Sequence, residues 1–170
     1  IVRQQIPCTA LVPIVDPEVV DQALAAGVGS EVTVRLGGKL DPANHTPLEL
    51  TARVMGTSPA PKVRSHDGHG FAKTDETVLL QAGNVFIAVS KSQAGINHAD
   101  VWRHFGLEPA EARMVVVKMI GHFESFRPFM KDLLFADCPG WSGDLREFNW
   151  TKIPRPMYPF DATMEWQAVV

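Results

Sequence analysis

The stretch from Arg113 to Trp141 limits the possible folds of this 170-residue chain more than any other, because two apolar runs flank a segment rich in aromatic residues. The first run, Val115 to Val117, is β-branched and typical of a buried strand. The second, Leu133 to Ala136, predicts another strand. Between them the aromatic residues recur at every third position, as one helical face requires, and are Phe123, Phe126 and Phe129. We expect two parallel strands joined by a right-handed crossover in a compact α/β unit.

Pro128 interrupts the segment between the two apolar runs. Proline removes a helical hydrogen bond and disfavours helical backbone at the residue before it. We therefore expect an irregular turn over residues 122–127 and a short helix that begins at Pro128.

Three polar residues follow the predicted strands of this unit. Lys118 ends the first run, His122 follows across a turn that contains Gly121, and Asp137 follows the second run. In open α/β sheets, ligands bind beyond the carboxyl ends of strands. A lysine at such an end must reach water or a partner, and a histidine can exchange a proton near neutral pH. These residues are candidates for a functional rim; the alternative is an exposed strand end and a residue that caps the turn.

Local signals predict two helices elsewhere in the chain. Asp16 is a good N-cap and Pro17 suits the first helical position, so we expect a helix over residues 17–26 that ends at Gly27. A shorter helix is predicted over residues 99–105, before a glycine.

Alternating apolar residues predict the remaining strands. Residues 31–36 alternate with period two, and residues 48–55 form a second strand antiparallel to them. Residues 77–81 and 84–90 flank a Gly-Asn turn and predict a β-hairpin. Residues 56–70 are rich in glycine, proline and serine and predict an exposed loop. The expected fold is therefore α/β, a mixed β-sheet with packed helices.

Length and composition favour one compact domain with an extended, proline-rich C-terminal tail over residues 150–161. The net charge of −3 gives no electrostatic reason to expect nucleic acid or an anionic membrane as a partner. No apolar run approaches the roughly 20 residues that a membrane helix needs. The two cysteines lie far apart, which favours a reducing, cytoplasmic setting.

Two further motifs resemble ligand sites. His66 and His69 lie three positions apart in a glycine-rich loop, and this spacing fixes no metal geometry, so we expect solvated histidines and no metal site. Gly37-Gly38-Lys39 either ends a strand or forms a loop that contacts substrate or a partner domain. In the second case Lys39 and Asp41 would point outward.

Seven short motifs occur in an order that is known from one protein family. They are Asp16-Pro17-Glu18-Val19-Val20, Ala25-Ala26-Gly27-Val28-Gly29, Leu36-Gly37-Gly38-Lys39 with Asp41-Pro42, Val116-Val117-Lys118, Gly121-His122-Phe123, Asp137-Cys138-Pro139-Gly140 and Arg155-Pro156-Met157-Tyr158-Pro159-Phe160-Asp161. Over residues 1–170 the chain resembles the C-terminal domain of the MlrC (microcystinase C) family of candidate metallopeptidases. One departure is the loop at residues 64–69, where the family usually has a Gly-Pro-Met element.

The resemblance implies a two-domain hydrolase of peptides or small amides, whose zinc is held mainly by a larger N-terminal domain. The chain begins with Ile1, so we expect a piece of a longer protein, inactive and without zinc when isolated. The domain would form one wall of the active-site cleft. Lys118 and His122 would position substrate or stabilise developing charge, and Lys39, Asp41 and Asp137 would contact substrate or the other domain. The alternative is a non-catalytic binding domain that forms homo-oligomers.

Overall fold

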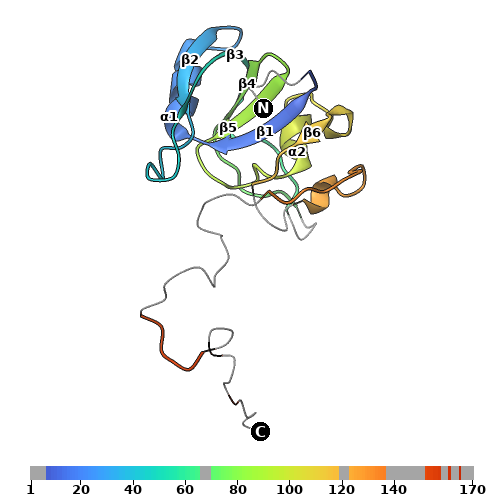
Figure 1. Ribbon diagram of the computed structural model, residues 1–170. Coiled ribbons are helices and arrows are strands. Elements are labelled where there is room, and N and C mark those ends of the chain that lie inside the picture. The colour runs from blue at the N-terminus through green and yellow to red at the C-terminus, as the bar shows by residue number, and fades with distance from the viewer. Residues whose placement is uncertain are drawn as a thin grey trace. The chain divides into compact units, whose positions relative to one another are not determined.

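A computed structural model of the chain describes residues 7–65, 70–118, 123–136, 152–157, 161 and 165. Contacts divide the chain into two units, residues 1–133 and 134–170. All helices and strands found among the described residues belong to the first unit (Figure 1). The described residues of the second unit form neither helix nor strand. Within the described ranges no helix has the length and hydrophobicity to cross a membrane.

The first unit is built on a mixed sheet of six strands, in the order β2-β3-β4-β5-β1-β6. The strands are β1 (Ala10–Val15), β2 (Glu31–Leu36), β3 (Leu48–Ser58), β4 (Thr77–Ala82), β5 (Val85–Ser90) and β6 (Met114–Val115). β1 lies parallel to β5 and β6, and the other neighbouring pairs are antiparallel. This confirms the predicted α/β class, the 31–36 and 48–55 pair and the hairpin.

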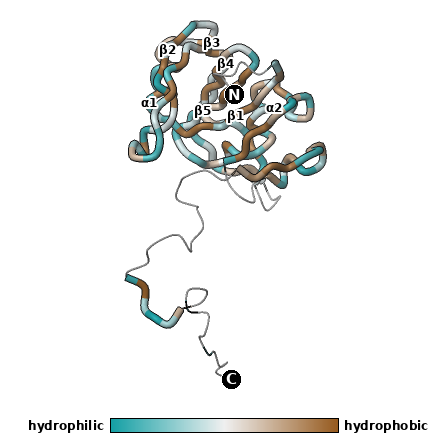
Figure 2. Tube along the Cα trace, viewed as in Figure 1, coloured by the Kyte–Doolittle hydropathy of each residue, from teal (hydrophilic) through white to brown (hydrophobic). Residues whose placement is uncertain are grey.

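The two helices cover opposite faces of the sheet (Figure 1). α1 (Pro17–Ala26) packs with one face of β1, β4 and β5, and α2 (Ala99–His104) packs with the other. Because side chains alternate along a strand, Ile87 of β5 joins the α1 side and Ala88 joins the α2 side. Both faces of β1 and β5 are covered, and Figure 2 shows these strands as mostly hydrophobic. Both helix predictions are confirmed, the second ending one residue earlier.

The predicted loop over residues 56–70 is wrong at its start, residues 56–58, and in its expected exposure at Val63. β3 continues to Ser58 through a bulge between Val54 and Gly56. Gly56 lies in the strand beside the ring of Phe105, which a Cβ at this position would meet at 3.0 Å. Val63 is buried in the α2 layer. The glycine in this strand leaves space for an aromatic ring. The residues around Gly56 in the sequence do not indicate this contact, because Phe105 is distant in the chain.

In the unit predicted over residues 113–136, the irregular turn agrees with residues 123–127, but the second strand, the helix at Pro128 and the crossover are wrong. β6 is a half-buried edge strand of two residues, extended by one hydrogen bond from Val116 N to Leu11 O of 2.9 Å. Glu124–Phe126 forms a single 3-10 turn, and no helix begins at Pro128. The run at residues 131–136 is exposed and forms no strand. The parallel strands of the sheet are β1, β5 and β6 instead. The apolar run at residues 133–136 pairs with no strand of this sheet, and composition alone does not make it a strand.

Candidate functional site

β1 and β5 end side by side, and we call this side of the sheet, together with the segment after β6, the carboxyl rim; it is defined by Asp16, Asn97 and Lys118. Asp16 follows β1 directly, and its backbone N–H donates to the carbonyl of Ser90 at the end of β5, at 3.0 Å. Asn97 lies in the segment after β5, and Lys118 follows β6. The pairing of β1 with β5 places Asp16 at the end of β5, whereas β6 ends opposite Leu11, four residues before the end of β1.

A buried amide fixes the backbone of Lys118 at the carboxyl rim. The N–H of Lys118 donates to Oδ1 of Asn97 at 3.0 Å, and Asn97 is buried. Lys118 itself is exposed. The rim therefore presents an ammonium group on a backbone that is tied to the loop after β5. Nothing in the sequence pattern distinguished Asn97, because a single asparagine in a loop carries no local signal.

The other two candidates for this rim, His122 and Asp137, lie outside the described residues, as do His66 and His69. The roles of His122 and Asp137, and their place at the same rim as Lys118, stay predictions. Within residues 7–65, 70–118 and 123–136, and the short described stretches beyond, no three side chains of His, Cys, Asp or Glu form a group that could hold a metal ion. The described residues therefore do not fit a catalytic zinc, and no step through a metal is assigned to them.

Asp16 connects α1 to the loop after β2. Its carboxylate, only 2% exposed, accepts hydrogen bonds from Val19 N at 3.3 Å and from Gly37 N at 2.9 Å. It also binds the ammonium of Lys39 at 2.9 Å, and Lys39 lies 3.0 Å from Glu18 as well. The ammonium of Lys39 thus faces the start of α1 and does not point freely outward.

The charge state of Lys39 follows from these contacts. Burial alone would lower the pKa of Lys39, but hydrogen bonds to Asp16 and Glu18 outweigh it and raise the pKa above 10.5. The loop approaches closely at Gly38, whose φ is +67° and whose Cβ, if present, would lie 2.7 Å from the carbonyl carbon of Thr46. The two glycines therefore shape the loop, and the lysine holds it to the helix.

Asp41 lies further along the same loop and stabilises a turn. Its carboxylate accepts a hydrogen bond from Asn44 Nδ2, and its backbone carbonyl accepts one from His45 N, both at 2.9 Å. These contacts are local. A contact of Asp41 with substrate or with another domain stays a prediction.

A second charged cluster, which the sequence did not suggest, lies beside α1. Lys91 follows β5 and binds the carboxylates of Asp21 and Glu76, the first at 2.8 Å. Hydrogen bonds to both carboxylates raise the pKa of Lys91 above its ordinary value. This lysine connects α1 to the segment before β4. Ion pairs therefore also stabilise the structure next to the end of β5.

Comparison with known proteins agrees with this architecture. A family model described as MlrC C-terminus matches residues 1–152. Microcystinase C from Sphingomonas sp. is 27% identical over 150 residues, which are 88% of this chain but 29% of that protein. The crystal structure of a candidate metallopeptidase from Mesorhizobium sp. BNC1 superposes with a TM-score of 0.75 at 22% identity, covering 94% of this chain and 32% of that one. The chain thus spans about a third of the length of both proteins.

Proposed function

Because the chain belongs to the family of MlrC C-terminal domains, we propose that it is the C-terminal domain of a zinc-dependent amide or peptide hydrolase. A larger N-terminal domain of the same protein would hold most of the metal ligands, and this domain would form one wall of the cleft. Two observations support the proposal. The chain covers 29% and 32% of two longer relatives, and their names, microcystinase C and candidate metallopeptidase, denote hydrolases.

The carboxyl rim is the observation that carries the assignment of the cleft wall. The parallel strands β1 and β5 end there together, and crevices beyond such ends are the usual ligand sites of α/β sheets. Lys118 combines an exposed side chain with a backbone fixed by buried Asn97. An ammonium group carried on a fixed backbone at such a rim is suited to stabilise negative charge on a reacting group.

Each candidate residue has a distinct role in this proposal. A bound zinc ion would activate water and polarise the scissile carbonyl. The ammonium of Lys118 would stabilise the negative charge that develops on the carbonyl oxygen, and His122 would orient substrate or transfer a proton. The positive charge of Lys39 is already paired with the carboxylates of Asp16 and Glu18, so this residue would act mainly by holding its loop. Asp41 and Asp137 would contact substrate or the N-terminal domain.

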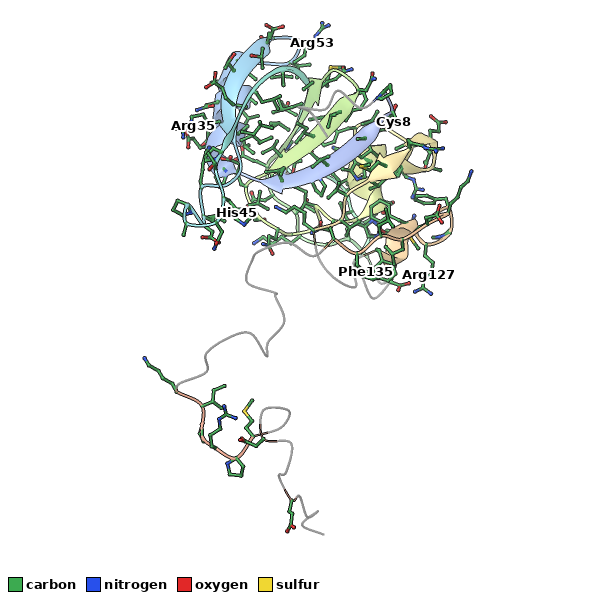
Figure 3. The ribbon with its side chains drawn as sticks, in the orientation of Figure 1. Cys8, Arg35, His45, Arg53, Arg127 and Phe135 are labelled. Atoms are coloured by element: carbon green, nitrogen blue, oxygen red, sulfur yellow. The ribbon has the colours of Figure 1, made fainter. Side chains whose placement is uncertain are left out.

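Kinetics of the full-length protein test the proposal. Turnover of a panel of N-acylated peptides is measured for wild type, Lys118→Ala and His122→Ala, together with thermal midpoints. We expect kcat to fall about 10²-fold in each variant, with stability changed by about 0.5 kcal/mol or less. Arg53→Ala is the matched control, because Arg53 lies on the exposed side of β3, away from the carboxyl rim (Figure 3).

Two results would contradict the proposal in different ways. Normal turnover in both rim variants would reject the catalytic wall and leave a domain for binding or assembly, which size measurements of the oligomer would then test. Zinc analysis after exhaustive dialysis addresses the metal. We expect zinc in the full-length protein and none in the 170-residue chain; zinc held stoichiometrically by the short chain, and lost on replacing His66 and His69, would place the metal here instead.

A further inference from the structure

A surface groove of about 350 Å³ lies in the α2 layer, apart from Asp16 and Lys39. Its walls come from three segments: the stretch after β3, α2 with its N-cap, and the turn after β6. The lining residues are Arg64, Ser65, His98, Arg103, Ser125, Pro128 and Phe129. The volume is at the small end of the range for ligand pockets. Two guanidinium groups beside an aromatic ring give the groove both a charged and an apolar side.

The two arginines converge because they share one carboxylate. Arg64 Nε lies 3.1 Å from Oδ2 of Asp100, and Arg103 Nη1 lies 3.4 Å from Oδ1. The Asp100 side chain is 13% exposed, whereas that of Arg64 is 66% exposed. The carboxylate is thus more buried than the guanidinium of Arg64, whose side chain faces solvent.

Asp100 remains ionised under this arrangement. Burial alone would raise the pKa of its carboxyl, but hydrogen bonds from the side chain and backbone of Arg64 lower it. The backbone contact, Arg64 N to Asp100 Oδ2, is 3.1 Å. The same carboxylate therefore fixes the loop as well as the orientation of its arginine.

The guanidinium group of Arg103 is held in one orientation by Glu108 and Phe129. Its Nε and Nη2 donate to the two carboxylate oxygens of Glu108, each at 2.9 Å, and its guanidinium lies 5.6 Å from the centre of the Phe129 ring. A guanidinium has five N–H donors, and the contacts with Glu108 and Asp100 use three. Donors on both terminal nitrogens remain for an incoming acceptor, in the fork geometry that suits a carboxylate.

The groove wall on the far side is fixed to α2 by Ser125. Ala99 N donates to Ser125 Oγ at 3.0 Å, so the turn that carries Phe129 is tied to the start of the helix. Phe126, which precedes Phe129 by three residues, is buried in the α2 layer. The apolar side of the groove is thus pre-formed, which limits the entropy lost on binding.

We propose that this groove binds a small carboxylate that carries an apolar group. Arg64 and Arg103 would engage the carboxylate, and Phe129 with Pro128 would cover the apolar group. Asp100 and Glu108 balance the two guanidinium charges, so the local field favours a monoanion over a phosphate dianion. The inference stands independently of the proposed hydrolase function, because it concerns the chain alone and needs no metal.

Titration of the 170-residue chain with N-acetylphenylalanine, followed by amide chemical shifts, tests the inference. Because the arginine charges are balanced, we expect weak saturable binding with a Kd on the order of 1 mM. The shifted amides should belong to residues 64–65, 98–103 and 125–129. N-acetylphenylalaninamide, which lacks the charge, should bind about tenfold more weakly. This comparison uses the wild-type chain only, so it does not depend on the folding of any variant.

Variants locate the contact. Arg64→Gln and Arg103→Gln should each weaken binding of N-acetylphenylalanine about tenfold. Arg35→Gln on the exposed side of β2 should leave it unchanged (Figure 3). Equal binding of acid and amide, unchanged affinity in both groove variants, or absence of saturation at about ten times the expected Kd would each overturn the proposal. Tighter binding of phenyl phosphate than of the carboxylate would overturn the assignment to a monoanion.

Discussion

The two helices begin in a similar way and are held very differently. Near the start of each, an aspartate binds a cation that lies far away in the sequence: Asp16 binds Lys39, 23 positions on, and Asp100 binds Arg64, 36 positions back. Asp16 is almost fully buried and also accepts two backbone hydrogen bonds. Asp100 is less buried, and the guanidinium of Arg64 that it binds is mostly exposed. The contact type is shared, but the surroundings differ.

The two sides of the sheet therefore differ in how far water reaches their ion pairs. On the α1 side the carboxylate of Asp16 is only 2% exposed, so losing a buried partner leaves a polar group unsatisfied. On the α2 side water can replace a lost partner, and exposed ion pairs contribute little to stability. The groove lined by Arg64 and Arg103 lies in the second layer, where side chains can exchange a water for a ligand.

Asp16→Ala tests the α1 side most severely. The variant removes the helix cap, leaves Gly37 N without its acceptor and takes a partner from Lys39. We expect the free energy of unfolding to fall by about 3 kcal/mol, from about 1 for the cap and about 2 for the buried donor. Urea unfolding followed by circular dichroism measures the change.

Asp21→Ala in the same helix is the matched control for this comparison. Asp21 is exposed and binds Lys91 at 2.8 Å, so its loss should cost about 0.5 kcal/mol. If the two variants were equally stable, burial would not distinguish the two carboxylates, and the strong hold assigned to Asp16 would be rejected.

Gly38→Ala examines how closely the loop after β2 packs. A Cβ at Gly38 would lie 2.7 Å from backbone carbon of Thr46, and the residue has φ of +67°. Gly83 has φ of +58° in the hairpin but no atom within 4 Å of the same Cβ position. We expect Gly83→Ala to cost about 1 kcal/mol from backbone strain and Gly38→Ala about 2 kcal/mol or more, because the clash adds to the strain. Thermal midpoints of both variants decide whether the close approach exists in solution.

The α1 side could be predicted from sequence because its signals are local. Asp16 and Pro17 define the helix start, Gly27 defines its end, and the alternation of residues 31–36 gives the buried face of β2. What the sequence could not provide was the partner of Lys39, because the contact with Asp16 spans 23 positions. The interpretation of Gly37-Gly38-Lys39 therefore remained open between a strand end and a contact loop.

The α2 side was predicted less well because tertiary contacts decide its structure. Val115 to Val117 has the composition of a central strand, yet it lies at the sheet edge with a two-residue ladder. Leu134 and Phe135, 91% and 71% exposed, have the composition of a strand but no partner among the described residues. Lys118 was identified from its place after a strand, whereas Asn97, Arg64 and the groove depend on distant contacts that no local pattern encodes.

Val115→Ala measures how much the short edge strand contributes to stability. Val115 is half-buried at the edge of the α2 layer, whereas Val78 in β4 is fully buried. We expect about 1 kcal/mol for Val115→Ala and about 2 kcal/mol for Val78→Ala, in proportion to the apolar surface that leaves water. Denaturant unfolding of both variants provides the comparison, and equal losses would show that β6 is packed as tightly as the sheet centre.

Asp100→Asn should have the smallest effect, and its pH dependence identifies the cause. The folded-state pKa of Asp100 lies below its ordinary value of 3.8. A lowered pKa adds stability that is present above the unfolded-state value and is lost as the pH falls through the folded-state value. At pH 7 we therefore expect Asp100→Asn to cost about 1 kcal/mol or less, since Arg64 is exposed and water screens the pair. The difference between wild type and variant should shrink as the pH falls below 3.8. Urea unfolding at a series of pH values measures this difference. A difference that stays constant into acid would show that the variant loses packing, and that the charge of Asp100 does not stabilise the α2 layer.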